Sequence, residues 1–139
     1  MDYKIKFHFP SNQEFNYLFN SVGWGVREDS KINKHRDSSV FAVCVYDKDC
    51  IIGMLRIVGD GSYYTIYDVV VDKKYQGKGI GTLLMNKAVE WYKSIEDDDT
   101  YLYLGASEKK EDFYKKFGFV SRPYEGMGAG MKYDPDYYN

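Results

Sequence analysis

A chain of 139 residues with 19 basic and 21 acidic side chains has a net charge of −2, so it lacks the basic field that attracts nucleic acids or anionic lipids. Its length suits one domain with a sizeable core, and we predict a single domain over residues 1–139. No apolar run approaches the roughly 20 residues that span a bilayer, and the N-terminus does not resemble a signal peptide, so we expect no membrane association.

The two cysteines, Cys44 and Cys50, lack the spacing of a metal site and lie in apolar, strand-like stretches. We therefore predict reduced thiols in a cytoplasmic protein, with no bound metal.

The N-terminal part predicts one strand and two helices. Residues 3–9 alternate charged and bulky side chains, which is typical of a half-buried strand. Ser11 and Glu14 have the spacing of a capping box, which predicts a helix that runs to about Asn20. A second, weakly patterned helix is expected from Asp29 to His35.

Three apolar stretches then predict an antiparallel meander. Residues 40–46 and 50–58 are strands joined by a tight turn, and residues 66–71 form a third, β-branched strand. Gly53 lies inside the second strand, which indicates a bulge or a close backbone contact.

A glycine-spaced turn, Gln76-Gly77-Lys78-Gly79-Ile80-Gly81-Thr82, joins the third strand to an amphipathic helix that reaches Ile95. Glycines at alternate positions allow a sharp turn and let a ligand approach the backbone. Unpaired N–H groups at the helix N-terminus favour an anion there. We interpret the turn as a pyrophosphate cradle, with a plain strand-to-helix connection as the alternative. Its spacing differs from the dinucleotide fingerprint and from the P-loop.

The C-terminal part begins with a short strand over residues 101–104, expected to lie parallel to the strand over residues 66–71 because a helix connects them. A short helix follows, in which Phe113 and Phe117 are four residues apart and face the core. Tyr114 lies one position away from that apolar stripe and can point out of the core.

Two segments resemble the motifs of the GNAT superfamily of acetyl-CoA-dependent N-acetyltransferases. The turn from Gln76 to Gly81 matches [Q/R]-x-x-G-x-[G/A], and residues 107–119 are similar to N-x-x-A-x-x-[LF]-Y-x-x-x-G-F. Phe113-Tyr114 and Gly118-Phe119 match the second motif in place. Ser107 and Lys110 depart from it, where the family usually has Asn and Ala.

This resemblance, which covers about residues 40 to 120, implies an α/β (α+β) fold. The expected architecture is a mixed, mostly antiparallel twisted sheet of six or seven strands with about four helices, its central strands parallel and splayed. The last strand would run from about Met127 to Tyr133, in a hairpin with residues 119–121.

The resemblance also implies acetyl-CoA as cosubstrate. Its pantetheine arm would enter between the two parallel strands and pair with the backbone of the first, as an added strand does. The implied cofactor-binding residues are Val69, Val70, Val71, Gln76, Gly77, Lys78, Gly79, Ile80, Gly81, Thr82, Ser107 and Tyr114.

Acetyl transfer to an amine requires removal of the ammonium proton, polarisation of the thioester carbonyl and stabilisation of the leaving thiolate. Asp68 is a carboxylate in an apolar strand, which favours a base or an ammonium anchor; an exposed or paired aspartate is the alternative. Glu28 is the second candidate base, and water the third. The resemblance assigns Tyr114 to the thiolate, with aromatic packing as the alternative.

By resemblance, the acceptor contacts are Phe19, Trp24, Arg27, Glu28, Tyr67 and Asp68. The run Tyr67-Asp68-Val69-Val70-Val71 looks like the branch of the superfamily that acetylates aralkylamines, which favours a small amine with an apolar body. A protein lysine or N-terminal acetyltransferase and a non-catalytic acyl-CoA-binding module stay open as alternatives. A homodimer is compatible with the sequence.

Overall fold

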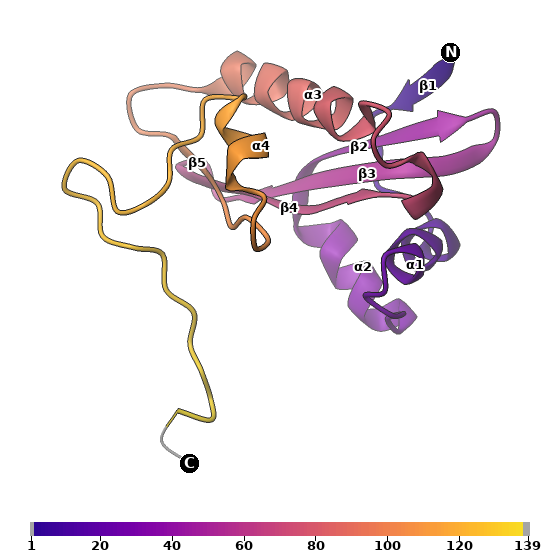
Figure 1. The fold of residues 1–139 in the computed structure, drawn as a ribbon, viewed down its shortest axis with the longest axis horizontal. Helices are drawn as coiled ribbons and strands as arrows, with labels where there is room; N and C mark the ends of the chain where they lie inside the picture. The colour runs from indigo at the N-terminus through magenta and orange to yellow at the C-terminus, as the bar shows by residue number, and fades with distance from the viewer. Residues whose placement is uncertain (1, 138–139) are drawn as a thin grey trace. The chain divides into compact units, whose positions relative to one another are not determined.

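The computed structural model describes residues 2–137, and the chain divides into two compact units, the first ending at Leu104 and the second beginning at Gly105. The first unit contains a mixed sheet with helices on both faces (Figure 1). Its elements, in chain order, are β1 (Tyr3–Lys6), α1 (Asn12–Ser21), α2 (Asp29–Ser38), β2 (Ser39–Asp47), β3 (Cys50–Gly59), β4 (Tyr63–Val71), the 3-10 helix η1 (Lys73–Tyr75), α3 (Ile80–Ile95) and β5 (Tyr101–Leu104).

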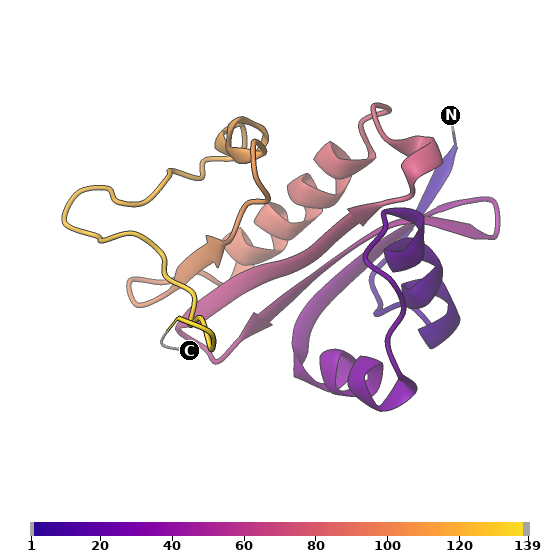
Figure 2. The same cartoon turned by 60° about the horizontal axis from the view of Figure 1, so that its bottom comes forward.

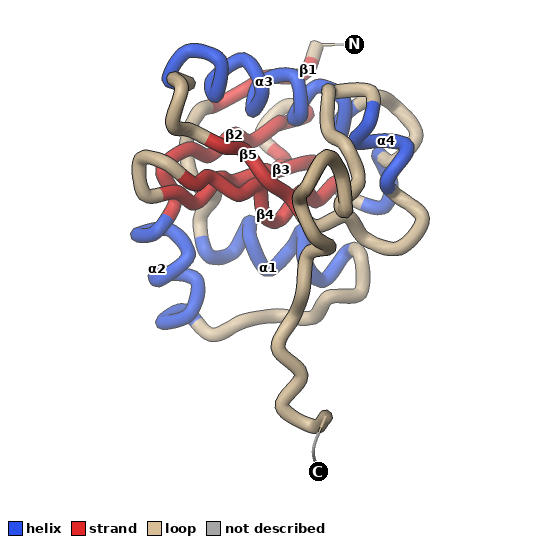
Figure 3. The backbone as a smooth tube through the Cα atoms, turned by 90° about the vertical axis from the view of Figure 1, so that its left-hand side faces the viewer, coloured by secondary structure: helices blue, strands red, loops and turns tan. Residues whose placement is uncertain are grey.

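The strands follow one another across the sheet in the order β1-β2-β3-β4-β5. The first four are antiparallel neighbours, whereas β5 is parallel to β4. This parallel pair confirms the expectation from the helical crossover. Figure 2 shows α1 and α2 on one face of the sheet and α3 on the other, and Figure 3 shows the strands between these helical layers.

The prediction of six or seven strands is wrong, because the sheet of the described residues has five. The expected last strand near residues 127–133 is absent from that part of the chain, where only an isolated bridge joins Tyr124 to Met127. Met131 is 97% exposed and Tyr133 is 85% exposed, so the segment buries too little apolar surface to offset the entropy of ordering its glycines.

Two sets of apolar side chains make the core. On one face, α1 buries Phe15, Leu18 and Phe19 together with Ile32 of α2. The capping box that starts α1 is present: Glu14 N–H donates to Ser11 Oγ at 3.1 Å, and Ser11 N–H donates to Glu14 Oε1 at 3.0 Å. On the other face, α3 buries Ile80, Leu84 and Ala88 of the apolar stripe that its sequence predicts, and Met85 in addition. Leu83, Trp91 and Tyr92 of that stripe are only half-buried, and Ile95 is exposed.

Gly53 lies directly under α3, which confirms the predicted close contact. A Cβ at this position would lie 2.9 Å from Ile80 Cγ2 and 3.2 Å from Leu84 Cδ1. Because Ile80 lies within the glycine-spaced turn and is the first residue of α3, this packing anchors the turn to the sheet.

Substitution of Gly53 with Val is expected to destabilise the protein by about 1–3 kcal/mol, the usual cost of overpacking a core. The added side chain would push α3 away from β3. Gly128→Val is the control, because a Cβ there would have no neighbour within 4 Å. Thermal melts of both variants measure the effect, and equal melting temperatures would contradict the close packing.

The second unit contains the helix α4 (Glu111–Lys115), so the described residues form four α-helices, as predicted. Phe113 contacts Phe117 edge to face, with ring centroids 5.3 Å apart, as the spacing of the two residues predicts. Gly118, with φ +95°, ends this segment in a conformation that suits glycine.

Candidate functional site

The glycine-spaced turn is open on the side that a ligand would approach. Gly77 has φ +79° and Gly79 has φ +84°, and both glycines are exposed. A Cβ at either position would have no neighbour within 4 Å, so the space beside the backbone is not filled by the protein. Gly79 is also the N-cap of α3, and no side chain caps the helix there. The turn therefore offers main-chain N–H groups to an anion, which fits a pyrophosphate.

Contacts at both ends hold this turn in place. Before it, Gln76 Nε2 donates to the carbonyl oxygen of Val71 at 3.2 Å. Where the turn enters α3, Ile80 is buried against Gly53. Within it, the Lys78 ammonium lies 5.1 Å from the centre of the Tyr75 ring, which keeps a positive charge beside the glycines.

The end of β4 that precedes the turn has a free edge. Its pairing with β5 covers only Tyr63–Ile66. Among residues 2–137, the stretch from Tyr67 to Val71 therefore has β3 on one side and no paired strand on the other. Main-chain groups along this edge are available to an extended ligand, as in β-augmentation. The cofactor-binding prediction for Val69, Val70 and Val71 concerns this same stretch.

A β-bulge interrupts β4 within that stretch. Arg56 pairs with Tyr67 and Met54 with Val70, so Asp68 and Val69 both face the single residue Leu55 of β3. Asp68 has φ +55°, in the left-handed region that residues with a Cβ rarely adopt. Bulges of this kind often lie next to active sites. The sequence gives no sign of this bulge, because it has no glycine there.

Asp68, predicted to be a base or an ammonium anchor, is paired with a cation in this structure, as its alternative prediction has it. Arg56 Nε donates to Asp68 Oδ2 at 2.6 Å, and the two side chains are 9% and 20% exposed. One carboxylate oxygen of Asp68 therefore already accepts a hydrogen bond from the Arg56 guanidinium. Arg56 comes from β3, in an apolar stretch that sequence reasoning treats only as core.

The predicted acceptor contacts differ in their access to solvent. Phe19 is 1% exposed and belongs to the core, so a direct contact with an acceptor is excluded in this structure. Trp24 is 50% exposed and contacts the Phe19 ring edge to face, while the Arg27 guanidinium lies 4.5 Å from the centre of that ring. Glu28 is exposed at the N-cap of α2, and Tyr67 is 47% exposed.

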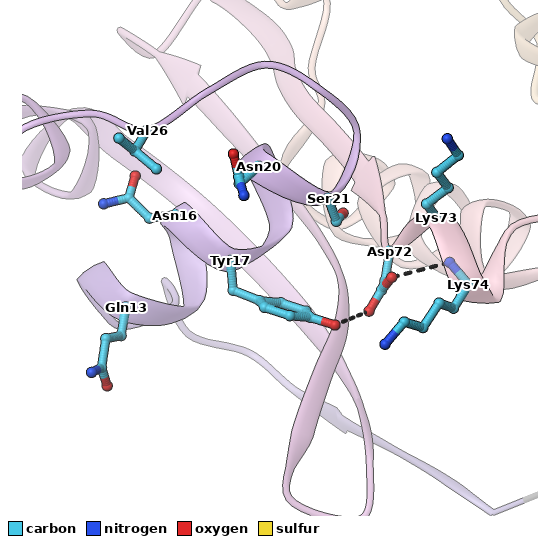
Figure 4. A pocket seen from close by; sticks show the side chains of 9 residues that line it. All are labelled: Gln13, Asn16, Tyr17, Asn20, Ser21, Val26, Asp72, Lys73 and Lys74. Carbon is cyan, nitrogen blue, oxygen red and sulfur yellow. Dashed lines mark hydrogen bonds between the residues drawn. The ribbon is translucent and has the colours of Figure 1, made fainter.

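A pocket of about 560 Å³ lies between α1 and the segment after β4 (Figure 4). Tyr17 reaches across from α1 and donates its hydroxyl to Asp72 Oδ2 at 2.6 Å, which raises the pKa of Tyr17. Asp72 is 3% exposed, and its Oδ1 accepts the Lys74 N–H at 3.1 Å. The sequence analysis missed this pair, since Tyr17 and Asp72 are 55 positions apart. The pair connects α1 to the residue that precedes η1.

Ser107 and Tyr114 belong to the second unit, whereas the other predicted site residues lie in the first. Ser107 is exposed, and its carbonyl oxygen accepts the Lys110 N–H at 3.0 Å. The Tyr114 ring contacts Phe113 edge to face at 5.1 Å, and burial raises the pKa of its hydroxyl. A phenol with a raised pKa stays protonated at neutral pH and can donate a hydrogen bond.

The described residues, 2–137, contain neither a metal-binding group nor a membrane-spanning helix. Within them, His, Cys, Asp and Glu side chains do not gather into a group that could hold a metal ion. Across the same residues, every helix is too short or too polar to cross a membrane. Cys44 is buried and Cys50 exposed, and both are free thiols, as predicted.

Comparison with known proteins places this geometry in a family. The Acetyltransferase (GNAT) family model matches residues 8–119. An uncharacterized N-acetyltransferase, ycf52 of Gracilaria tenuistipitata var. liui, is 36% identical over 111 residues, which are 76% of this chain and 60% of that protein. Histone acetyltransferase TAP1 of Glycine max is 30% identical over 132 residues, 86% of this chain and 55% of that protein. The chain thus spans little more than half the length of these two relatives.

A solved structure has a similar fold over most of the chain. The crystal structure of a probable acetyltransferase of unknown function from methicillin-resistant Staphylococcus aureus has a TM-score of 0.83 and 30% sequence identity, and the match covers 95% of this chain and 100% of that one. The family match, this likeness and the open glycine turn between β4 and α3 agree. The chain therefore belongs to the acetyltransferase (GNAT) family, whose members are acetyl-CoA-dependent enzymes.

Proposed function

We propose that this protein transfers an acetyl group directly from acetyl-CoA to a primary amine. The observation that carries the proposal is the turn from Gln76 to Thr82, in which Gly77 and Gly79 adopt left-handed conformations beside open space at the start of α3. The free edge of β4 leads directly into this turn, so an extended thioester and its pyrophosphate have adjacent binding features.

The proposed cofactor contacts follow from these two features. Main-chain groups of Val69, Val70 and Val71 would pair with the pantetheine arm, and the N–H groups of the turn would hold the pyrophosphate. The Lys78 ammonium adds a positive charge at the turn. Bound acetyl-CoA would supply the activated acetyl group, and Ser107 and Tyr114 keep their proposed cofactor roles from the second motif.

In the proposed reaction, the neutral amine attacks the thioester carbon, the C–S bond breaks and the thiolate leaves. Tyr114 would donate a hydrogen bond to that thiolate, which its raised pKa favours because the phenol keeps its proton. Asp68, Glu28 and water stay the proposed candidates for removal of the ammonium proton. Asp68 would use Oδ1, because its Oδ2 accepts a hydrogen bond from Arg56.

The acceptor that we favour is a small amine with an apolar body, such as an aralkylamine. Trp24 and Tyr67 offer half-exposed aromatic surface for that body, and Asp68 Oδ1 can accept a hydrogen bond from the amine. A protein lysine or N-terminal acceptor is the second candidate, favoured by the likeness to a relative named histone acetyltransferase. The homodimer and the cytoplasmic location stay predictions.

A panel of amines is expected to contain at least one acceptor that accelerates release of free thiol from acetyl-CoA. Aromatic ethylamines come first in the panel, followed by aliphatic diamines and lysine peptides. Thiol release without any amine is the control for simple hydrolysis. An inactive panel together with measurable CoA binding would instead favour a non-catalytic acyl-CoA-binding module, and preference for the peptides would favour a protein acetyltransferase.

A further inference from the structure

The bulge in β4 lies directly before the stretch that is proposed to bind the cofactor arm. Each residue inserted into a strand turns the following side chains and main-chain groups to the opposite sides. The extra residue at Asp68–Val69 therefore decides which N–H and C=O groups of Val69–Val71 face the free edge. A left-handed conformation at Asp68 maintains the bulge, although most residues with a Cβ avoid it.

The side chain of Arg56, on the neighbouring strand β3, contacts this bulge. This side chain is 9% exposed, and its Nε donates to Asp68 Oδ2 at 2.6 Å. Its guanidinium carbon also lies 5.4 Å from the centre of the ring of Tyr67, the residue just before the bulge. Tyr67, which precedes the bulge, and Asp68, its first residue, thus both contact the buried guanidinium of Arg56.

The same guanidinium connects the bulge to the neighbouring elements. Arg56 Nη1 lies 3.4 Å from Ser39 Oγ, at the start of β2, and 3.5 Å from the carbonyl oxygen of His35, near the end of α2. Ser39 Oγ in turn donates to the His35 carbonyl at 2.7 Å. The planar fork of an arginine can make these contacts at once, whereas the single ammonium of a lysine cannot.

We propose that Arg56 is a positioning residue that keeps Asp68 in its left-handed conformation and thereby sets the edge of β4 along which the cofactor binds. This inference rests on the proposed function for the identity of the ligand, but the conformation of Asp68 does not depend on any ligand. Arg56 itself need not touch acetyl-CoA or the acceptor. Its contribution reaches the site through the backbone.

Arg56→Met is expected to weaken CoA binding about tenfold, and to lower kcat/KM on the order of 10²-fold, as displacement of a bound group by about 1 Å can do. Arg56→Lys should weaken CoA binding and lower kcat/KM less than Arg56→Met does, because lysine keeps the positive charge but lacks the planar guanidinium. The double variant Arg56→Met/Asp68→Gly is the decisive one. Glycine adopts a positive φ without strain, so this variant should regain most of the CoA affinity although the ion pair is gone.

Two readouts separate this role from a merely structural one. Calorimetry of CoA binding is done well below the melting temperature of each variant, so that lost stability alone does not alter the affinity. The Cα and Cβ chemical shifts of residue 68 report its backbone conformation without cofactor, and Arg56→Met should move them away from left-handed values. If Arg56→Met does not fold, Arg56→Lys and Asp68→Ala carry the same two measurements.

Three results would each lead to a different conclusion about Arg56. Unchanged shifts of Asp68 in the Arg56 variants would overturn the proposal, even for a protein that binds no CoA. Failure of Asp68→Gly to restore affinity in the double variant would overturn it as well, and would assign the ion pair a direct electrostatic role. Absence of CoA binding in the wild type, with the expected shift changes in the variants, would refute the proposed function and leave the role of Arg56 in setting the bulge supported.

Discussion

Gly79→Asp is expected to reduce CoA affinity by more than about 100-fold, whereas Gly79→Asn should reduce it only about tenfold. The two side chains have nearly the same size, and both residue types adopt left-handed conformations more readily than others do. They differ in charge, and an anion at the N-cap of α3 would face the pyrophosphate proposed to lie there. The difference between the two variants therefore isolates electrostatics from backbone strain.

Gly61 supplies a matched control for the strain itself. It has φ +104°, its Cβ position is open, and it lies in the turn between β3 and β4 rather than in the glycine-spaced turn. Gly61→Asp should lower the melting temperature while leaving CoA affinity, measured by calorimetry, unchanged. Equal affinity in Gly79→Asn and Gly79→Asp would contradict the assignment of the turn to the pyrophosphate.

Tyr114→Phe is expected to lower kcat by roughly 10²–10⁴-fold with little change in either KM, since it removes a hydrogen bond made chiefly in the transition state. Burial raises the pKa of Tyr114 above its ordinary value of 10.0, so the wild-type phenol is protonated throughout the neutral and mildly alkaline range. Any loss of activity caused by its ionisation should therefore begin at a higher pH than for an ordinary phenol, and should be missing from the Phe variant.

Tyr124→Phe is the control, since Tyr124 belongs to the same unit and is 46% exposed. Its kcat should equal that of the wild type. Thermal melts accompany both variants, because a common loss of stability would lower the amount of active enzyme without altering the pH–rate profile. Full kcat in Tyr114→Phe across the whole profile would show that the phenol only packs, and water would then protonate the thiolate.

The sequence predicts most of the fold because its strongest patterns are local. The capping box at Ser11, the apolar stripe of α3 and the crossover to β5 each depend on residues within one element or one connection. The last strand was not predictable in this way. Residues 127–131 contain enough apolar residues to suggest a strand, but strand formation also requires a surface that buries them, and Met131 stays exposed.

The features of the candidate site also differ in whether local sequence predicts them. The glycine turn could be predicted because glycine spacing records a backbone requirement in the sequence itself. Three features depend on residues that are distant in sequence, namely the Arg56–Asp68 pair, the bulge between β3 and β4, and the Tyr17–Asp72 contact. An aspartate in an apolar strand signals a special position, but the sequence does not reveal which cation accompanies it. The burial of Phe19, by contrast, follows from the helical spacing of Phe15, Leu18 and Phe19, and only the family resemblance suggested an acceptor contact for it.

Titration of isotope-labelled protein with CoA, followed by the backbone amide resonances, tests most directly whether the turn and the β4 edge form the cofactor site. The amides of Val69–Val71 and of Gly77–Thr82 should shift in a saturable manner, and the same titration with Gly79→Asp should leave them unchanged. Shifts confined to other parts of the chain, or no shifts at all at high CoA concentration, would contradict the assignment of this surface to acetyl-CoA.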